Sequence, residues 1–342
     1  MTMSRYPFAA NPFRRVCSSV IAAFGLVTFA GAALADESGA SFWQPGTYDS
    51  FSAVPSQPGW SLSTSEFHSA AYAGSDVTAA RLIRTGAIQE TQIGSLSATS
   101  ASFSNLLTVS PSYVFQVPAL DAKASLSVTG VVGKSSVSEA GVLQANLGSS
   151  SVAGPFSIGD SVTGFGDFSP QATLYWNRDV HNFMIYGTGN APVGAYKVTR
   201  LANLGLGHAA VDGGGGYTYY DQGAGNEFSA VAGFTYNMSN LATGYRSGVD
   251  FHLDLGASKH LTESLLVGPV AYFYDEVGCD SGSGDKVGCF RSRVAGLGAQ
   301  IGHSFPFEAA QGYLNLKAYG EFAEANRPSG WTARVTFSIS PK

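Results

Sequence analysis

The strongest constraint on the fold of this chain is a two-residue alternation of apolar and polar side chains, which recurs along residues 59–339. In residues 249–258 one face carries Val249, Phe251, Leu253, Leu255 and Ala257. Because a β-strand points successive side chains to opposite sides of a sheet, this period predicts strands with one apolar and one polar face. Many such strands in an exported protein predict a transmembrane antiparallel up-and-down β-barrel, with lipid outside and a polar lumen inside.

An export signal precedes these segments. Residues 1–35 combine an arginine-containing start, an apolar stretch over residues 16–32 and a small-residue cleavage motif, Ala33-Leu-Ala35, before Asp36. This order is typical of a cleaved signal peptide. A retained anchor is disfavoured, because the apolar stretch is short and strand-like sequence follows it. We therefore expect export to the bacterial outer membrane.

The charge of the exported chain argues against a nucleic-acid partner. Without the three arginines of residues 1–35, the 19 Lys and Arg become 16 against 24 Asp and Glu, so the net charge is −8. Phosphate binding requires clustered basic residues. The exported chain also lacks the run of about 18 apolar residues that a helical span requires. A membrane location then requires a closed barrel, because lipid offers no partner to an open sheet edge.

About twelve strands are predicted, and the lengths of their connections alternate. The strands are expected at residues 59–73, 104–117, 121–133, 167–177, 181–188, 212–221, 227–238, 249–259, 264–275, 290–304, 310–323 and 330–340. Short turns follow every second strand, whereas residues 74–103, 134–166 and 189–211 are expected as long loops. Outer-membrane barrels have short periplasmic turns and longer external loops. The alternation therefore favours a barrel over a soluble β-sandwich.

Some strands depart from the simple pattern. Pro111 and Pro269 fall inside proposed strands, where each removes one ladder hydrogen bond. Residues 264–275 are apolar on both faces, and residues 290–304 change phase near Ala295, as a β-bulge would cause.

The two cysteines of the exported chain lie close together. Cys279 and Cys289 flank a short polar loop. In an oxidising compartment such a pair is expected to form a disulfide. The alternative is two free thiols. A zinc site is disfavoured, because two thiolates without nearby histidines make a poor ligand set.

Charged residues on the polar faces of the strands are expected to line the lumen. They are Asp250, His252, Asp254, Lys317, Glu321 and Arg334. Two interpretations stay open, a structural salt-bridge network that fills the interior and a path for a solute. A twelve-stranded barrel lies between side-chain-filled barrels of eight strands and porins with open channels. A small solute or a narrow gated route is what this size allows.

No catalytic, cofactor or metal site is predicted. The glycine run after Asp212 lacks the Lys-Ser/Thr of a phosphate loop, and the acidic residues around Asp280 do not have the spacing of an EF-hand loop. One kind of outer-membrane barrel is a phospholipase with a Ser–His pair. None of the six histidines lies in the His-x-Ser-Asn-Gly context of that enzyme.

Several short motifs together resemble a known family. They are Phe42-Trp-Gln-Pro-Gly46, Pro58-Gly-Trp60, Thr243-Gly-Tyr-Arg-Ser-Gly-Val-Asp-Phe-His252, Asp280-Ser-Gly-Ser-Gly284 and Arg293-Val-Ala-Gly-Leu-Gly298. In their order and spacing the chain resembles the outer-membrane proteins of the meta-pathway phenol degradation family, which is related to the sphingosine-induced outer-membrane protein. The resemblance implies a barrel linked to the use of aromatic or other hydrophobic compounds. It implies no phenol-degrading chemistry.

We therefore expect a signal peptide at residues 1–35, a leader at residues 36–58 and one barrel domain at residues 59–342. The leader contains four aromatic residues and is expected either to plug the lumen or to be disordered. The expected function is passive uptake of small hydrophobic or aromatic compounds, with outer-membrane lipid and such solutes as partners. A structural or adhesive barrel and a lipid-modifying enzyme are the alternatives.

Overall fold

The computed structural model describes residues 41–85, 88–147, 150–285, 288–289 and 291–342. The predicted signal peptide, residues 1–35, lies outside the described residues. The strands are β1 (Gly59–Thr85), β2 (Ile88–Val117), β3 (Ala122–Leu147), β4 (Ser150–Phe165), β5 (Ser169–Arg178), β6 (His181–Gly189), β7 (Ala210–Asp221), β8 (Asn226–Asn237), β9 (Val249–His260), β10 (Leu265–Glu276), β11 (Arg293–Pro306), β12 (Ala310–Ala325) and β13 (Ser329–Pro341). A short 3-10 helix, η2 (Pro118–Leu120), follows β2. Among the described residues, no helix is long and apolar enough to span a membrane.

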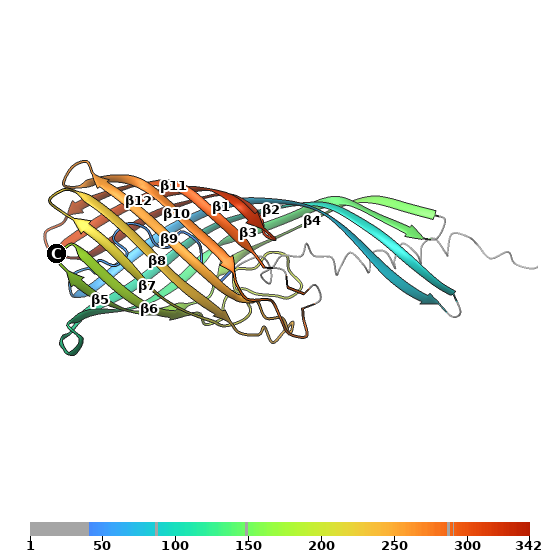
Figure 1. The fold of residues 1–342 in the computed structure, drawn as a ribbon, viewed down its shortest axis with the longest axis horizontal. Coiled ribbons are helices and arrows are strands. Elements are labelled where there is room, and N and C mark those ends of the chain that lie inside the picture. The colour runs from blue at the N-terminus through green and yellow to red at the C-terminus, as the bar shows by residue number, and fades with distance from the viewer. Residues whose placement is uncertain (1–40, 86–87, 148–149, 286–287, 290) are drawn as a thin grey trace, which may run out of the picture.

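The strands form a closed antiparallel barrel, which confirms the predicted fold (Figure 1). β1 pairs with β13, so the first strand of the chain lies beside the last. The first part of β3, residues 123–129, pairs with β5, and the rest, residues 132–147, pairs with β4. β4 and β5 therefore occupy one position in the wall, and the 13 assigned strands fill twelve positions.

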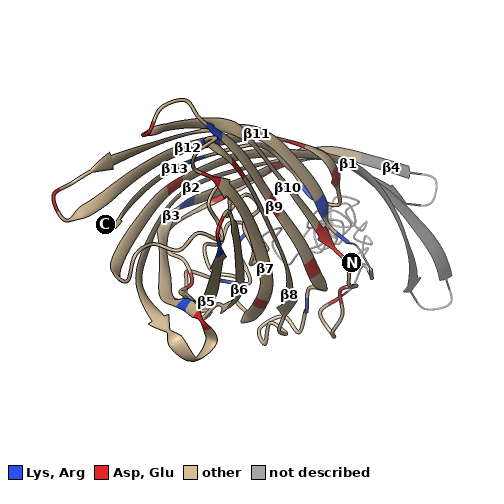
Figure 2. Ribbon diagram, turned by 60° about the vertical axis from the view of Figure 1, so that its left-hand side comes forward, with Lys and Arg blue, Asp and Glu red and all other residues tan. Residues whose placement is uncertain are grey.

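The barrel reverses the usual distribution of polarity. Large apolar side chains lie exposed on its outer surface, among them Leu126 at 56%, Phe234 at 54% and Leu297 at 60% exposure. Polar and charged side chains are buried inside, including Asp250, Asn315 and Lys317. This inversion is what a lipid-facing wall around a polar lumen requires. Charged positions lie along the strands of the wall as well as in the connections (Figure 2).

Two ends of the barrel can be told apart. The turn end carries short connections, such as residues 179–180 and 222–225, and the loop end carries residues 190–209, 238–248 and 277–285. The predicted loops at 74–103 and 134–166 are wrong. These residues extend β1, β2, β3 and β4 into two long hairpins that reach beyond the rest of the loop end (Figure 1). In these segments small residues alternate with serine and threonine, so the difference in polarity between the two faces is weak. Such a pattern does not distinguish a strand from a loop.

The irregular strands have local causes. Pro111 lies where the register between β2 and β3 is interrupted, and Pro269 lies in a similar gap between β9 and β10. The missing N–H of proline is the physical reason for such a gap. The predicted bulge near Ala295 is confirmed by a register shift between β11 and β12 at Arg293 and Ala295.

Candidate solute path through the barrel lumen

The described part of the leader, residues 41–58, lies inside the barrel (Figure 1). Its backbone is held by a buried carboxylate of β9: the amides of Gly46 and Tyr48 donate to the two oxygens of Asp254 at 2.8 and 3.0 Å. Charge-assisted bonds of this kind are about twice as strong as neutral ones. Burial raises the pKa of the Tyr48 phenol. The neutral hydroxyl accepts a hydrogen bond from the Gln171 amide at 3.0 Å.

A stack of rings joins the leader to the wall. The buried indole of Trp43 lies parallel to the His252 imidazole, with 3.8 Å between ring centroids and 10° between planes. The His252 Nε2 atom lies 3.0 Å from Asp212 Oδ2 and 3.2 Å from the Tyr186 hydroxyl. Trp43 also packs on Tyr186, at 5.9 Å between centroids. The leader therefore contributes to the same buried cluster as β6, β7 and β9.

Two buried cations also bind the leader. Lys317 Nζ donates to Asp49 Oδ2 at 2.6 Å, and the side chain of Lys317 is only 1% exposed. Arg334 donates to the Gln44 side chain at 3.2 Å and lies over the Phe67 ring. The predicted cations of β12 and β13 thus meet their partners in the leader.

Near the turn end, further contacts hold the leader. The Phe51 amide donates to Glu227 Oε1 at 3.0 Å, and the Ala53 amide donates to Thr218 Oγ1 at 3.0 Å. The Phe51 ring meets Tyr220 edge-on at 4.9 Å.

One strand glycine makes room for this segment. A Cβ atom at Gly256 would lie 2.7 Å from the Ser50 nitrogen and 2.8 Å from the Asp49 carbonyl carbon. Only glycine therefore allows the backbone of the leader to lie this close to β9.

A cavity of about 490 Å³ lies beside the leader on the loop-end side. Its walls come from leader residues 41–45, the inward side chains of β1, β2 and β3, residues 200–206 and residues 327–328. Aromatic surface is supplied by Phe42, Trp43, Phe67, Tyr245 and Tyr272, and small hydroxyls by the serines of β1, β2 and β3.

The segment 190–209 that closes one side of the cavity is fixed to the wall by Asp167. This buried carboxylate accepts hydrogen bonds from the Asn190 side chain at 2.9 Å, the Gly194 amide at 2.8 Å and the Leu206 amide at 3.0 Å. The segment therefore forms an ordered wall of the cavity.

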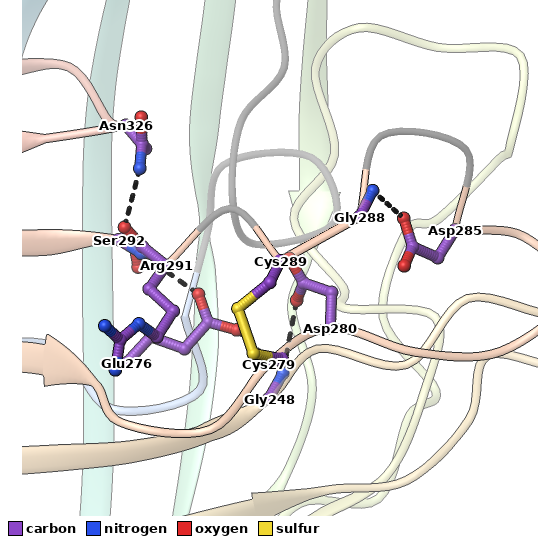
Figure 3. The surroundings of a disulfide bond; sticks show 10 residues. All are labelled: Gly248, Glu276, Cys279, Asp280, Asp285, Gly288, Cys289, Arg291, Ser292 and Asn326. Carbon is purple, nitrogen blue, oxygen red and sulfur yellow. Dashed lines mark hydrogen bonds between the residues drawn. A yellow bond between two sulfur atoms is a disulfide. The ribbon is translucent and has the colours of Figure 1, made fainter.

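A disulfide between Cys279 and Cys289 fastens the loop between β10 and β11, as predicted (Figure 3). Beside it, the Gly248 amide donates to Glu276 Oε1 at 2.8 Å and to Asp280 Oδ1 at 3.2 Å. The other oxygen of Glu276 accepts from the Ser292 amide at 3.0 Å. Loop and neighbouring strand are thus linked through buried carboxylates.

Replacing both Cys279 and Cys289 by serine should loosen this loop without opening the barrel. Closing a loop of sequence separation 10 contributes about 3 kcal/mol by the chain-entropy argument. We expect faster tryptic cleavage between β10 and β11 at an unchanged heat-dependent gel shift. Equal cleavage rates in the oxidised wild type and the double variant would contradict this prediction.

The structure brings four of the six predicted lumen residues together around the leader: His252, Asp254, Lys317 and Arg334. Asp250 is buried further toward the loop end and accepts from Asn237 Nδ2 at 2.9 Å. Glu321 borders the cavity and accepts from the Tyr272 hydroxyl at 2.7 Å and the Gly330 amide at 2.8 Å.

Sequence reasoning missed several buried groups. Asp212, Glu227, Trp43 and Tyr186 belong to the lumen cluster but were not selected. Glu227 could have been found, because it has the same parity as Ser229, Thr235 and Asn237, which are all buried. Tyr186 carried no signal, since an aromatic residue in a strand suits either face.

The family follows from a sequence match that covers most of the barrel. Residues 95–337 match the family described as "Putative MetA-pathway of phenol degradation". The chain belongs to this family. The match confirms the resemblance predicted from the short motifs. No curated protein matches the sequence.

One solved structure shares the barrel fold of this chain. The crystal structure of an outer membrane channel from Pseudomonas putida F1 is similar with a TM-score of 0.57 and 15% identity, over 87% of this chain and 99% of that chain. Weaker likenesses are OccAB1 from Acinetobacter baumannii (TM-score 0.32, 6% identity, 85% and 99% covered) and CdiB from Acinetobacter baumannii (TM-score 0.31, 7% identity, 84% and 60% covered). The first likeness shows a shared fold of outer-membrane type, and the other two carry no argument.

Proposed function

We propose that the protein is an outer-membrane channel through which small hydrophobic or aromatic compounds cross passively. The observation that carries the proposal is the cavity of about 490 Å³ in the lumen, with aromatic side chains and serine hydroxyls on its walls. Rings and hydroxyls together suit a solute with an apolar body and a few polar groups. The family match and the fold shared with an outer membrane channel support this proposal.

The size of the cavity favours small solutes. An apolar cavity of roughly 150 Å³ holds benzene, and ligand sites commonly measure about 300–1,000 Å³. A compound of one or two rings therefore fits at 490 Å³. The leader occupies the lumen next to the cavity, so we propose that it plugs the barrel and must yield for a solute to pass.

Single-channel recording on the full-length protein tests this function. We expect a small conductance that one-ring alcohols such as benzyl alcohol interrupt and glycerol at equal concentration does not. Replacing both Phe67 and Tyr272 by alanine should weaken the interruption about thirtyfold, because each ring contributes about 1 kcal/mol beyond its area. Protein-free bilayers control for effects of the solute on lipid.

Other outcomes would point elsewhere. A protein that shows the heat-dependent gel shift of a barrel but no conductance would support a structural or adhesive role. Release of fatty acid from the vesicles would support a lipid-modifying enzyme. A protein in the soluble fraction without a gel shift would contradict the outer-membrane location itself.

A further inference from the structure

Two arginines face the cavity without a carboxylate partner. Arg327 lies in the connection between β12 and β13, and Arg200 lies in segment 190–209. Among the residues that the structure describes, neither guanidinium forms an ion pair within 4.0 Å. Because an arginine is always charged in proteins, two positive charges border the cavity.

Arg327 is held in place by a ring. Its guanidinium carbon lies 5.0 Å from the centroid of Tyr274, a fully buried residue of β10. Its Nε and Nη1 atoms are buried and have no hydrogen-bond acceptor among the described residues. Leaving a buried donor without an acceptor destabilises the folded protein, and more so when the donor is charged. Such a group in a native structure calls for an explanation, and a bound water or anion is one.

Two of the three acidic residues that line the cavity accept hydrogen bonds from the protein. Asp167 accepts three hydrogen bonds from segment 190–209, and Glu321 accepts bonds on both oxygens. Glu139 lies on β3, with β1 and β2 between it and β13. Beside Tyr272 and Tyr274, the charge without a partner among the described residues is that of Arg327, although the chain as a whole is acidic.

We propose that the cavity binds small aromatic carboxylates, with Arg327 as the main anion-binding group and Arg200 as the second. This inference rests on the proposed function and narrows its solute class. The planar guanidinium matches the geometry of a carboxylate. The ring of the solute would lie against Phe42, Phe67 and Tyr272, which line the same space.

Calorimetric titration of the detergent-solubilised full-length protein with benzoate and benzamide tests the proposal. The two compounds have similar shape and differ in charge. We expect benzoate to bind about tenfold more tightly, because a hydrogen bond to a charged group is stronger than one between neutral groups. Arg327→Gln should remove most of this preference and leave benzamide binding unchanged. Arg200→Gln should reduce the preference less.

Arg293→Gln is the matched control, since Arg293 is exposed at the start of β11 and loses the same charge. If Arg327→Gln does not show the gel shift of a folded barrel, the test uses Arg327→Lys and Arg200→Gln instead. Each of these variants is expected to lose part of the preference for benzoate. Equal affinity for benzoate and benzamide in the wild type, or an undiminished preference in the folded variants, would overturn the proposal. Conductance that neutral aromatics interrupt would then leave the proposed channel function standing. If the barrel binds benzoate but conducts no current, the binding proposal stands and the proposed channel function is contradicted.

Discussion

Replacing residues 41–54 by a glycine–serine segment of equal length should raise single-channel conductance several-fold. The leader lies in the lumen and is bound there by Asp254, Lys317 and the Trp43–His252 stack. A flexible segment makes none of these contacts, so it would leave the lumen open for most of the time. Current through wild type and variant, recorded under identical salt and voltage, gives the comparison.

A single substitution in β9 tests whether the position of the leader matters when its sequence is unchanged. Gly256→Val keeps the leader intact but places side-chain atoms where the backbone of Ser50 and Asp49 now lies. We expect a rise in conductance in the same direction. Gly320→Val is the matched control, because a Cβ atom there meets nothing within 4 Å and the residue is exposed on β12. Unchanged conductance in both the leader replacement and Gly256→Val would rule out a plug.

Lys317→Met should both destabilise the barrel and release the leader. Removing one partner of a buried ion pair costs about 3–5 kcal/mol. Because the Asp49 side chain is 21% exposed and keeps some hydration, we expect the lower end of this range, about 3 kcal/mol. Urea unfolding in phospholipid vesicles measures the loss, and single-channel recording measures the accompanying rise in conductance.

Lys259→Met serves as the control for Lys317→Met. Lys259 is exposed near the turn end and binds the Ala224 carbonyl and the Asn226 side chain. Losing an exposed lysine should change the free energy of unfolding by about 1 kcal/mol or less. A similar loss of unfolding free energy in both variants would show that the buried ion pair with Asp49 does not stabilise the barrel more than an exposed lysine does.

The candidate site was partly predictable. Asp254 and Lys317 were selected because they alternate with apolar neighbours, and alternation fixes the face of a strand residue. Their partners could not be selected, because they lie 206 and 268 residues away in the chain. Spacing along the sequence gives no information on which segment enters a lumen. The sequence could not show that Arg327 Nε and Nη1 have no acceptor among the described residues, since a loop position has no periodic face.

The sequence by itself determined the class of fold: period-two alternation and the lack of a long apolar run after residue 35 together favour a closed β-barrel in lipid. It also determined the disulfide, because two cysteines close in an exported chain meet at low entropic cost. Only the tertiary structure decided how far β1 to β4 extend, where the leader lies and which charges remain unpaired. These features depend on contacts between segments far apart in the chain, and local side-chain patterns carry no record of them.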